Sequence, residues 1–112
     1  MRLNCYLTFS LAELALQPRE VAEAMLAACR RHAPARLMAL CQLEDRFLAI
    51  CHPLDSPEEA VQEIQVDCLL DPTPEAMLAL LRQRDEGGYS PVGSLSDSSG
   101  EGALRRFLVF QR

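Results

Sequence analysis

The stretch LMALCQLEDRFLAICH, residues 37–52, decides the fold of this chain. Two apolar runs, 37–43 and 47–52, flank the polar pair Glu44-Asp45. This pattern is typical of a β-hairpin, in which a tight turn joins two short strands. The sequence therefore predicts a hairpin at this point and an antiparallel sheet around it.

A two-residue turn sets the register of the hairpin. Residues whose numbers sum to 89 then lie opposite each other, so Cys41 should face Leu48 and Cys51 should face Met38. Both faces of the hairpin are apolar in this register, whereas an antiparallel pair with one wet face alternates apolar and polar residues. We therefore expect both faces to be covered. One face would carry Met38, Leu40, Phe47, Ala49 and Cys51, and the other Leu37, Ala39, Cys41, Leu43, Leu48 and Ile50.

Four more segments have the pattern of strands. Residues 3–9 alternate apolar with polar side chains, which indicates a strand with one buried face. We expect further strands at 61–70, with a possible helical turn before it, at 89–95 and at 104–111. The last strand is apolar on both faces, so it should lie inside the sheet or in a subunit interface.

Two helices are predicted between these strands. Pro18 begins the first, which carries an apolar stripe as far as Cys29. Thr73, Pro74 and Glu75 supply the cap, the first-turn proline and the first-turn acid of the second helix. Residues 10–17 are ambiguous, and we expect a short turn or helical piece there.

The resulting order is β-α-β-β-β-α-β-β, which predicts an α+β fold. We expect a mainly antiparallel sheet with two helices packed on one face, in a ferredoxin-like or related two-layer sandwich. Residues 1–112 should form a single domain, and 94–102 a flexible loop, because that stretch is rich in serine, glycine and acids. No internal repeat recurs at a fixed period.

The composition argues against nucleic-acid and membrane partners. The net charge is −5, so a nucleic-acid partner is not expected, because binding to phosphates needs concentrated positive charge. No stretch is apolar enough for a membrane span or a secretory signal, and we therefore expect a cytoplasmic protein with no membrane partner. All 11 basic residues are arginine, an excess that codon bias would explain.

Five cysteines do not indicate a metal site. Their number is odd, and no two have the close spacing of zinc ligands. Each lies in an apolar run, so we expect reduced and mostly buried thiols, with no metal and no cofactor. The five are Cys5, Cys29, Cys41, Cys51 and Cys68.

No pattern of catalytic residues stands out. Cys51 and His52 are the most tempting pair, but neighbours along a strand point to opposite faces and should not meet. Acids such as Asp55 and Asp71 precede turns or helix starts, where capping explains them. We therefore assign no catalytic residue, and a cysteine- or carboxylate-dependent enzyme is the least favoured hypothesis.

The excess of apolar strand surface favours a noncatalytic interaction or assembly module. Two helices can cover one face of a sheet, so the other face should meet a second copy of the chain or another protein. The alternative is a small-ligand-binding regulatory domain with a groove between the sheet and the loop 93–102. The expected interaction residues are Phe47, Met38, Leu40, Phe107, Val109, Arg105, Arg106 and Tyr89.

Overall fold

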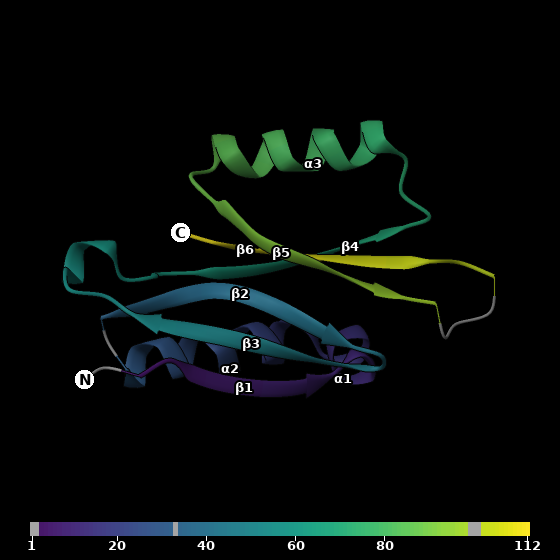
Figure 1. Cartoon of the computed structure of the whole chain (residues 1–112). Coiled ribbons are helices and arrows are strands. Elements are labelled where there is room, and N and C mark those ends of the chain that lie inside the picture. Colours follow the sequence, from purple (N-terminus) through teal and green to yellow (C-terminus); the bar gives the residue numbers. More distant parts are fainter. Residues whose placement is uncertain (1–2, 33, 99–101) are drawn as a thin grey trace.

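The structure is a computed structural model that describes residues 3–32, 34–98 and 102–112 (Figure 1). It confirms the α+β class, and the long elements follow the predicted order. Their bounds are β1 (Cys5–Ser10), α1 (Leu11–Leu16), α2 (Pro18–Arg31), β2 (Ala35–Leu43), β3 (Arg46–Pro53), the 3-10 turn η1 (Pro57–Glu59), β4 (Ile64–Leu70), α3 (Pro74–Glu86), β5 (Ser90–Asp97) and β6 (Arg105–Gln111).

The strands form two antiparallel sheets instead of the single sheet that the sequence predicts. Sheet A has the strand order β1-β3-β2, and sheet B has the order β4-β6-β5. In each sheet the last strand in sequence pairs antiparallel with both others and lies between them. Each half is thus a split β-α-β unit followed by a third strand, although the sequence shows no repeat. The ferredoxin-like arrangement is not confirmed.

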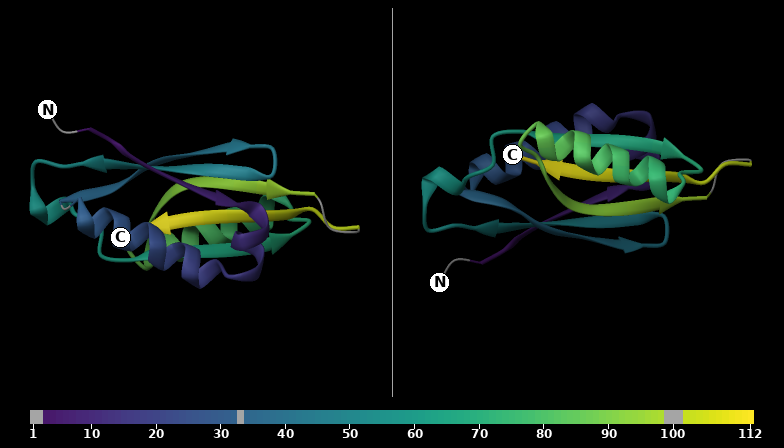
Figure 2. Two further views of the ribbon diagram at one scale, coloured as in Figure 1. Left: turned by 90° about the horizontal axis from the view of Figure 1, so that it is seen from below. Right: turned by 90° about the horizontal axis from the view of Figure 1, so that it is seen from above.

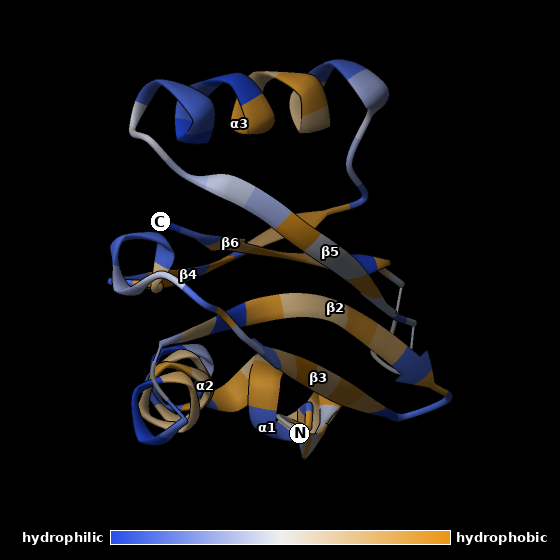
Figure 3. Cartoon of the chain, turned by 60° about the vertical axis from the view of Figure 1, so that its left-hand side comes forward, coloured by the Kyte–Doolittle hydropathy of each residue, from blue (hydrophilic) through white to orange (hydrophobic). Residues whose placement is uncertain are grey.

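The helices lie on different layers. Figure 1 shows α3 along one face of sheet B, on the side away from sheet A, and Figure 2 shows it from above over the strands of sheet B. In Figure 3, α2 lies beside sheet A and beneath sheet B. We call the face of sheet A that packs on α2 its inner face and the opposite face its outer face. The prediction of two helices on one face is wrong, because α3 lies on the far face of sheet B, whereas α2 packs against sheet A and against the opposite face of sheet B.

One core fills the space between α2 and the two sheets. It brings together Met25 and Cys29 from α2, Phe47 from sheet A, and Phe107 and Val109 from sheet B, all at most 2% exposed. Strand β6 supplies so much of this core because it is the central strand of sheet B, which agrees with its prediction as an inside strand.

The hairpin has the predicted two-residue turn but not the predicted register throughout. Cys41 lies opposite Leu48, as expected from the turn. A β-bulge then shifts the register between Leu37 and Ala39, so Cys51 lies opposite Leu37 and not opposite Met38. A bulge inserts one unpaired residue into a strand, and here it turns Leu37 into the core and leaves Met38 exposed.

Two glutamines join the sheets by hydrogen bonds to backbone groups. The side chain of Gln111 on β6 accepts from the N–H of Leu37 (2.9 Å) and donates to its carbonyl (2.8 Å). The side chain of Gln42 on β2 accepts from the N–H of Ser96 (2.9 Å) and donates to its carbonyl (2.6 Å). Each side-chain amide therefore connects β2 to sheet B through one accepted and one donated hydrogen bond.

One ambiguous segment agrees with the prediction of a helical piece, and another differs from the prediction. Residues 10–17 contain the short helix α1, and the Ser10 hydroxyl caps it by accepting from the N–H of Glu13 at 3.0 Å. Strand β5 continues to Asp97 and so enters the predicted loop 94–102, of which residues 99–101 lie outside the described part of the chain. Among the residues that the structure describes, no helix is long and apolar enough to cross a membrane.

Candidate functional site

The outer face of sheet A is the surface that the fold leaves open. In β1, Cys5, Leu7 and Phe9 pack against the core, so the alternation of the strand turns Tyr6 and Thr8 to the outer face. Their cross-strand partners on β3 are Ile50 and Leu48, which share that face. The outer face is completed by β2 and is defined here as Tyr6, Thr8, Met38, Ala39, Cys41, Leu43, Leu48 and Ile50.

This face is apolar and exposed. Tyr6 is 63% exposed, Met38 50% and Leu43 60%, and the ribbon of β2 and β3 in Figure 3 is largely apolar. Leu48 and Ile50 between them are half-buried. Sheet B is covered on one face by α3 and on the other by α2 and β2, whereas no described element covers the outer face of sheet A. Large apolar patches of this kind are rare on proteins without a partner.

The ends of the outer face carry polar groups. At one end, the His52 ring nitrogen Nδ1 lies 2.8 Å from the Asn4 side-chain oxygen Oδ1, and Arg36 lies opposite His52 on β2. At the other end, Arg46 precedes the apolar residues of β3. None of the eight residues is an aspartate, glutamate, histidine, lysine or arginine, and the charged Arg46 lies opposite Leu43 at the end of the face. The centre of the surface is therefore uncharged.

Several residues expected to interact lie in the core of the chain. Phe47 and Val109 are fully buried and Phe107 is 2% exposed, so these side chains are not accessible to a partner. Leu40 packs against the same core, where its side chain meets Gly93 of sheet B. Of the apolar residues in the predicted set, Met38 lies on the outer face, because the bulge directs it there.

The polar members of the predicted set lie on sheet B, away from the outer face. Arg105 forms an ion pair with the buried carboxylate of Asp97 at 3.4 Å. Arg106 is its half-buried neighbour on β6, opposite Leu69 of β4. The structure thus does not bring Arg105, Arg106 and Met38 together in one surface.

Tyr89 belongs to a polar cluster beside the end of β6. Its hydroxyl donates to the Glu63 carboxylate at 2.7 Å, and the Arg112 guanidinium lies 4.5 Å from its ring centre. These contacts lower the pKa of Glu63, through the hydrogen bond from Tyr89 and then that from Arg112. Arg112 also bonds the Gly87 carbonyl at 2.6 Å. The contacts fasten the end of α3 to sheet B, which is a structural role.

The cysteines divide into two groups. Cys29 and Cys51 are buried, with their Sγ atoms 3.4 Å apart, and burial raises the pKa of both thiols. A raised pKa suppresses the thiolate that a nucleophilic mechanism needs. Cys51 and His52 point to opposite faces, as the strand geometry predicts. The prediction of mostly buried thiols is wrong for Cys41 and Cys68, which are exposed.

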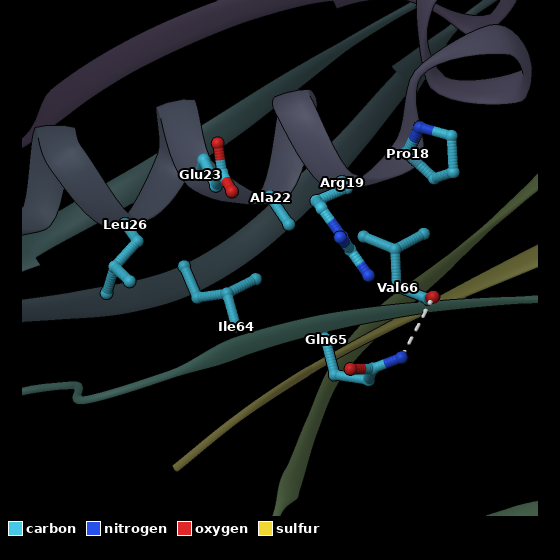
Figure 4. A pocket seen from close by; sticks show the side chains of 8 residues that line it. All are labelled: Pro18, Arg19, Ala22, Glu23, Leu26, Ile64, Gln65 and Val66. Carbon is cyan, nitrogen blue, oxygen red and sulfur yellow. Dashed lines mark hydrogen bonds between the residues drawn. The ribbon is translucent and has the colours of Figure 1, made fainter.

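The described residues form several surface grooves. Figure 4 shows one of about 480 Å³ between α2 and β4, in which Leu26 faces Ile64 while Gln65 turns away from the helix. Another, of about 640 Å³, lies between the hairpin turn and Ser96–Ser98, near the expected ligand groove but without Tyr89 or an arginine. Neither combines converging polar groups with an enclosed apolar cavity.

The described residues contain no group of three or more histidine, cysteine, aspartate or glutamate side chains arranged to hold a metal ion. Comparisons of the chain with protein-family models, with curated proteins and with solved structures find no match.

The sequence contained part of the signal for this surface. The alternation of 3–9 separates Tyr6 and Thr8 from the buried side of the strand, and the hairpin pattern groups Cys41, Leu43 and Leu48 on one face. The sequence does not predict which face of the hairpin is covered by α2, because that depends on how the helix packs against the sheet.

Proposed function

We propose that this chain is a noncatalytic assembly module that packs the outer face of sheet A against the same face of a second copy. The observation that carries the proposal is the exposure of Tyr6 on β1 and of Met38 and Leu43 on β2, the two strands that flank β3 in a sheet face that no described element covers. Burying such side chains contributes roughly 25 cal/mol per Å² of apolar surface removed from water.

The lack of charge at the centre of the face supports a second copy as the partner. The chain has a net charge of −5, so most contacts between two copies bring like charges together. A contact through the outer face avoids this repulsion, because its eight residues are uncharged. A two-fold axis parallel to the sheet and midway between the two packed faces would make the contact isologous, so that each copy uses the same residues.

Light scattering after size exclusion at micromolar concentration tests the proposal. We expect Leu43→Glu to halve the mass of the wild-type assembly, because it places a carboxylate in the apolar contact of each copy. Leu70→Glu is the matched control, since Leu70 is 65% exposed and lies on β4, outside the outer face. A wild-type chain that stays monomeric, or equal effects of both substitutions, would overturn the proposal.

A further inference from the structure

Strand β1 forms a free edge of sheet A. The sheet has the order β1-β3-β2, so β1 has a neighbour on one side. In Figure 1 it is the lowest strand of the sheet, and in the left panel of Figure 2, seen from below, it runs in front of the other strands. An edge strand presents backbone N–H and C=O groups that can pair with another strand.

The register identifies the residues that carry these groups. The N–H of Leu11 donates to the carbonyl of Asp45 at 2.8 Å, one position beyond the pair Ser10 and Arg46. Hydrogen-bonded pairs alternate along an antiparallel ladder, so Phe9, Leu7 and Cys5 direct their backbone groups to β3. Tyr6 and Thr8 then direct theirs to the free edge.

The other three edge strands carry features that hinder pairing with a further strand. Strand β2 has the bulge at Met38, β5 has Pro91 and a second bulge, and β4 carries Asp67 in its ion pair with Arg84 of α3. Strands β2 and β5 are also held by the side chains of Gln111 and Gln42. Charges, prolines and bulges are the means by which natural sheets block edge-to-edge association.

Strand β1 has none of these features. Its sequence, CYLTFS, contains no charge and no proline, and its register with β3 is unbroken from Cys5 to Ser10. Its side chains are apolar or hydroxyl-bearing on both faces, so an identical strand placed beside it meets no like charge. The edge is therefore suited to a second copy of itself.

We propose that β1 pairs antiparallel with β1 of a second copy, so that two sheets A become one six-stranded sheet. A register that places Leu7 opposite Leu7 of the second copy uses the whole strand and pairs Tyr6 with Thr8 across the axis. The two-fold axis then stands perpendicular to the sheet. This contact goes beyond the function proposed above, because it uses backbone groups of the edge and not side chains of the outer face.

Substitution of Thr8 by proline is the direct test. Proline removes an N–H that points to the free edge, and an edge strand tolerates it there because its own ladder does not use that group. We expect Thr8→Pro to halve the mass of the wild-type assembly while the far-ultraviolet circular dichroism is retained. Thr8→Val is the first control, because it alters the side chain on the outer face and keeps the N–H.

Cys68→Pro is the second control. Glu63 and Arg112 exchange backbone hydrogen bonds of 2.9 and 3.0 Å, so the same alternation places the N–H of Cys68 on the free edge of β4. It introduces proline at an equivalent edge position in the other sheet, and we expect it to keep the wild-type mass. A loss of mass with Cys68→Pro equal to that with Thr8→Pro would overturn the proposal.

Amide hydrogen exchange of the unaltered chain tests the pairing without any variant. The N–H groups of Tyr6 and Thr8 are protected if β1 is paired and exchange rapidly if the edge meets solvent. We expect protection that falls on dilution, because it depends on a second copy. Rapid exchange of both amides at the concentration of the full assembly would overturn the proposal even if Thr8→Pro failed to fold.

Discussion

At the scale of single residues, Gln111 stabilises the fold through two backbone groups at once. It is 4% exposed, and its side chain pairs both the N–H and the C=O of Leu37. A buried backbone group without a partner costs about 1–3 kcal/mol. We therefore expect Gln111→Ala to lower the free energy of unfolding by at least about 2 kcal/mol, as measured by urea denaturation at fixed protein concentration.

Gln42 provides the control for this prediction. It makes the same two bonds to Ser96, but it is exposed, so water can replace its amide. We expect Gln42→Ala to cost less than about 1 kcal/mol. Equal losses in the two variants would show that burial of the bonded groups does not set the difference.

The buried thiols of Cys29 and Cys51 predict a loss of stability in alkaline solution. Burial raises their pKa above 9.0, the ordinary value of a thiol, so the folded chain keeps protons that the unfolded chain releases. The free energy of unfolding therefore keeps the whole contribution of the two thiols below about pH 9. Above that pH it falls, by at most about 1.4 kcal/mol per pH unit for each thiol. Urea denaturation at about pH 8 and pH 10 measures the fall. The double variant Cys29→Ala/Cys51→Ala should show a smaller fall, and an unchanged one would contradict this assignment.

At the scale of elements, α2 and α3 should differ in local stability. Five residues of α2 are buried between the two sheets, whereas α3 has no buried residue and covers one face of sheet B. Its contacts include the paired hydrogen bonds of Arg84 to Asp67, at 2.8 and 2.7 Å. We expect α3 amides to exchange well before those of α2 in hydrogen-exchange mass spectrometry. Equal protection of the two helices would contradict this.

The elements that the sequence predicts well are those whose signals are local. Thr73 caps α3 by accepting from the N–H of Ala76 at 3.1 Å, and the two-residue turn at Glu44-Asp45 joins β2 to β3. Each signal lies within four residues of the structure it sets. The bulge at Met38 is different, because its partner is Gln111, 74 residues away from Leu37. No residue pattern within the hairpin predicts that hydrogen bond.

The division into two sheets is also a long-range property. Strand β6 is apolar on both faces, which correctly predicts an inside strand, but the pattern is the same whether the sheet has three strands or six. For the same reason the sequence identifies apolar faces without telling which of them meets solvent. Phe47 and Leu48 are neighbours of similar hydropathy, and the packing of α2 and sheet B places Phe47 in the core and leaves Leu48 half-buried.

At the scale of the whole molecule, the two proposed contacts give a closed assembly when their two-fold axes intersect. The two-fold axis of edge pairing stands perpendicular to sheet A, and the two-fold axis of face packing runs parallel to it, between the two packed faces. Perpendicular two-fold axes that intersect generate a closed tetramer with D2 symmetry. Two six-stranded sheets would then pack outer face against outer face, which is the geometry of a β-sandwich.

The masses of four proteins test this assembly and separate the two contacts. With a chain of 12.5 kDa, the wild type should contain four chains, Leu43→Glu and Thr8→Pro two each, and the double variant one. Each single variant removes one contact and leaves the other. A one-chain mass for Leu43→Glu would show that the edge does not pair, while a one-chain mass for Thr8→Pro would show that the face does not pack. Hydrogen exchange at Tyr6 and Thr8 should remain slow in Leu43→Glu, because its remaining dimer is the one held by β1.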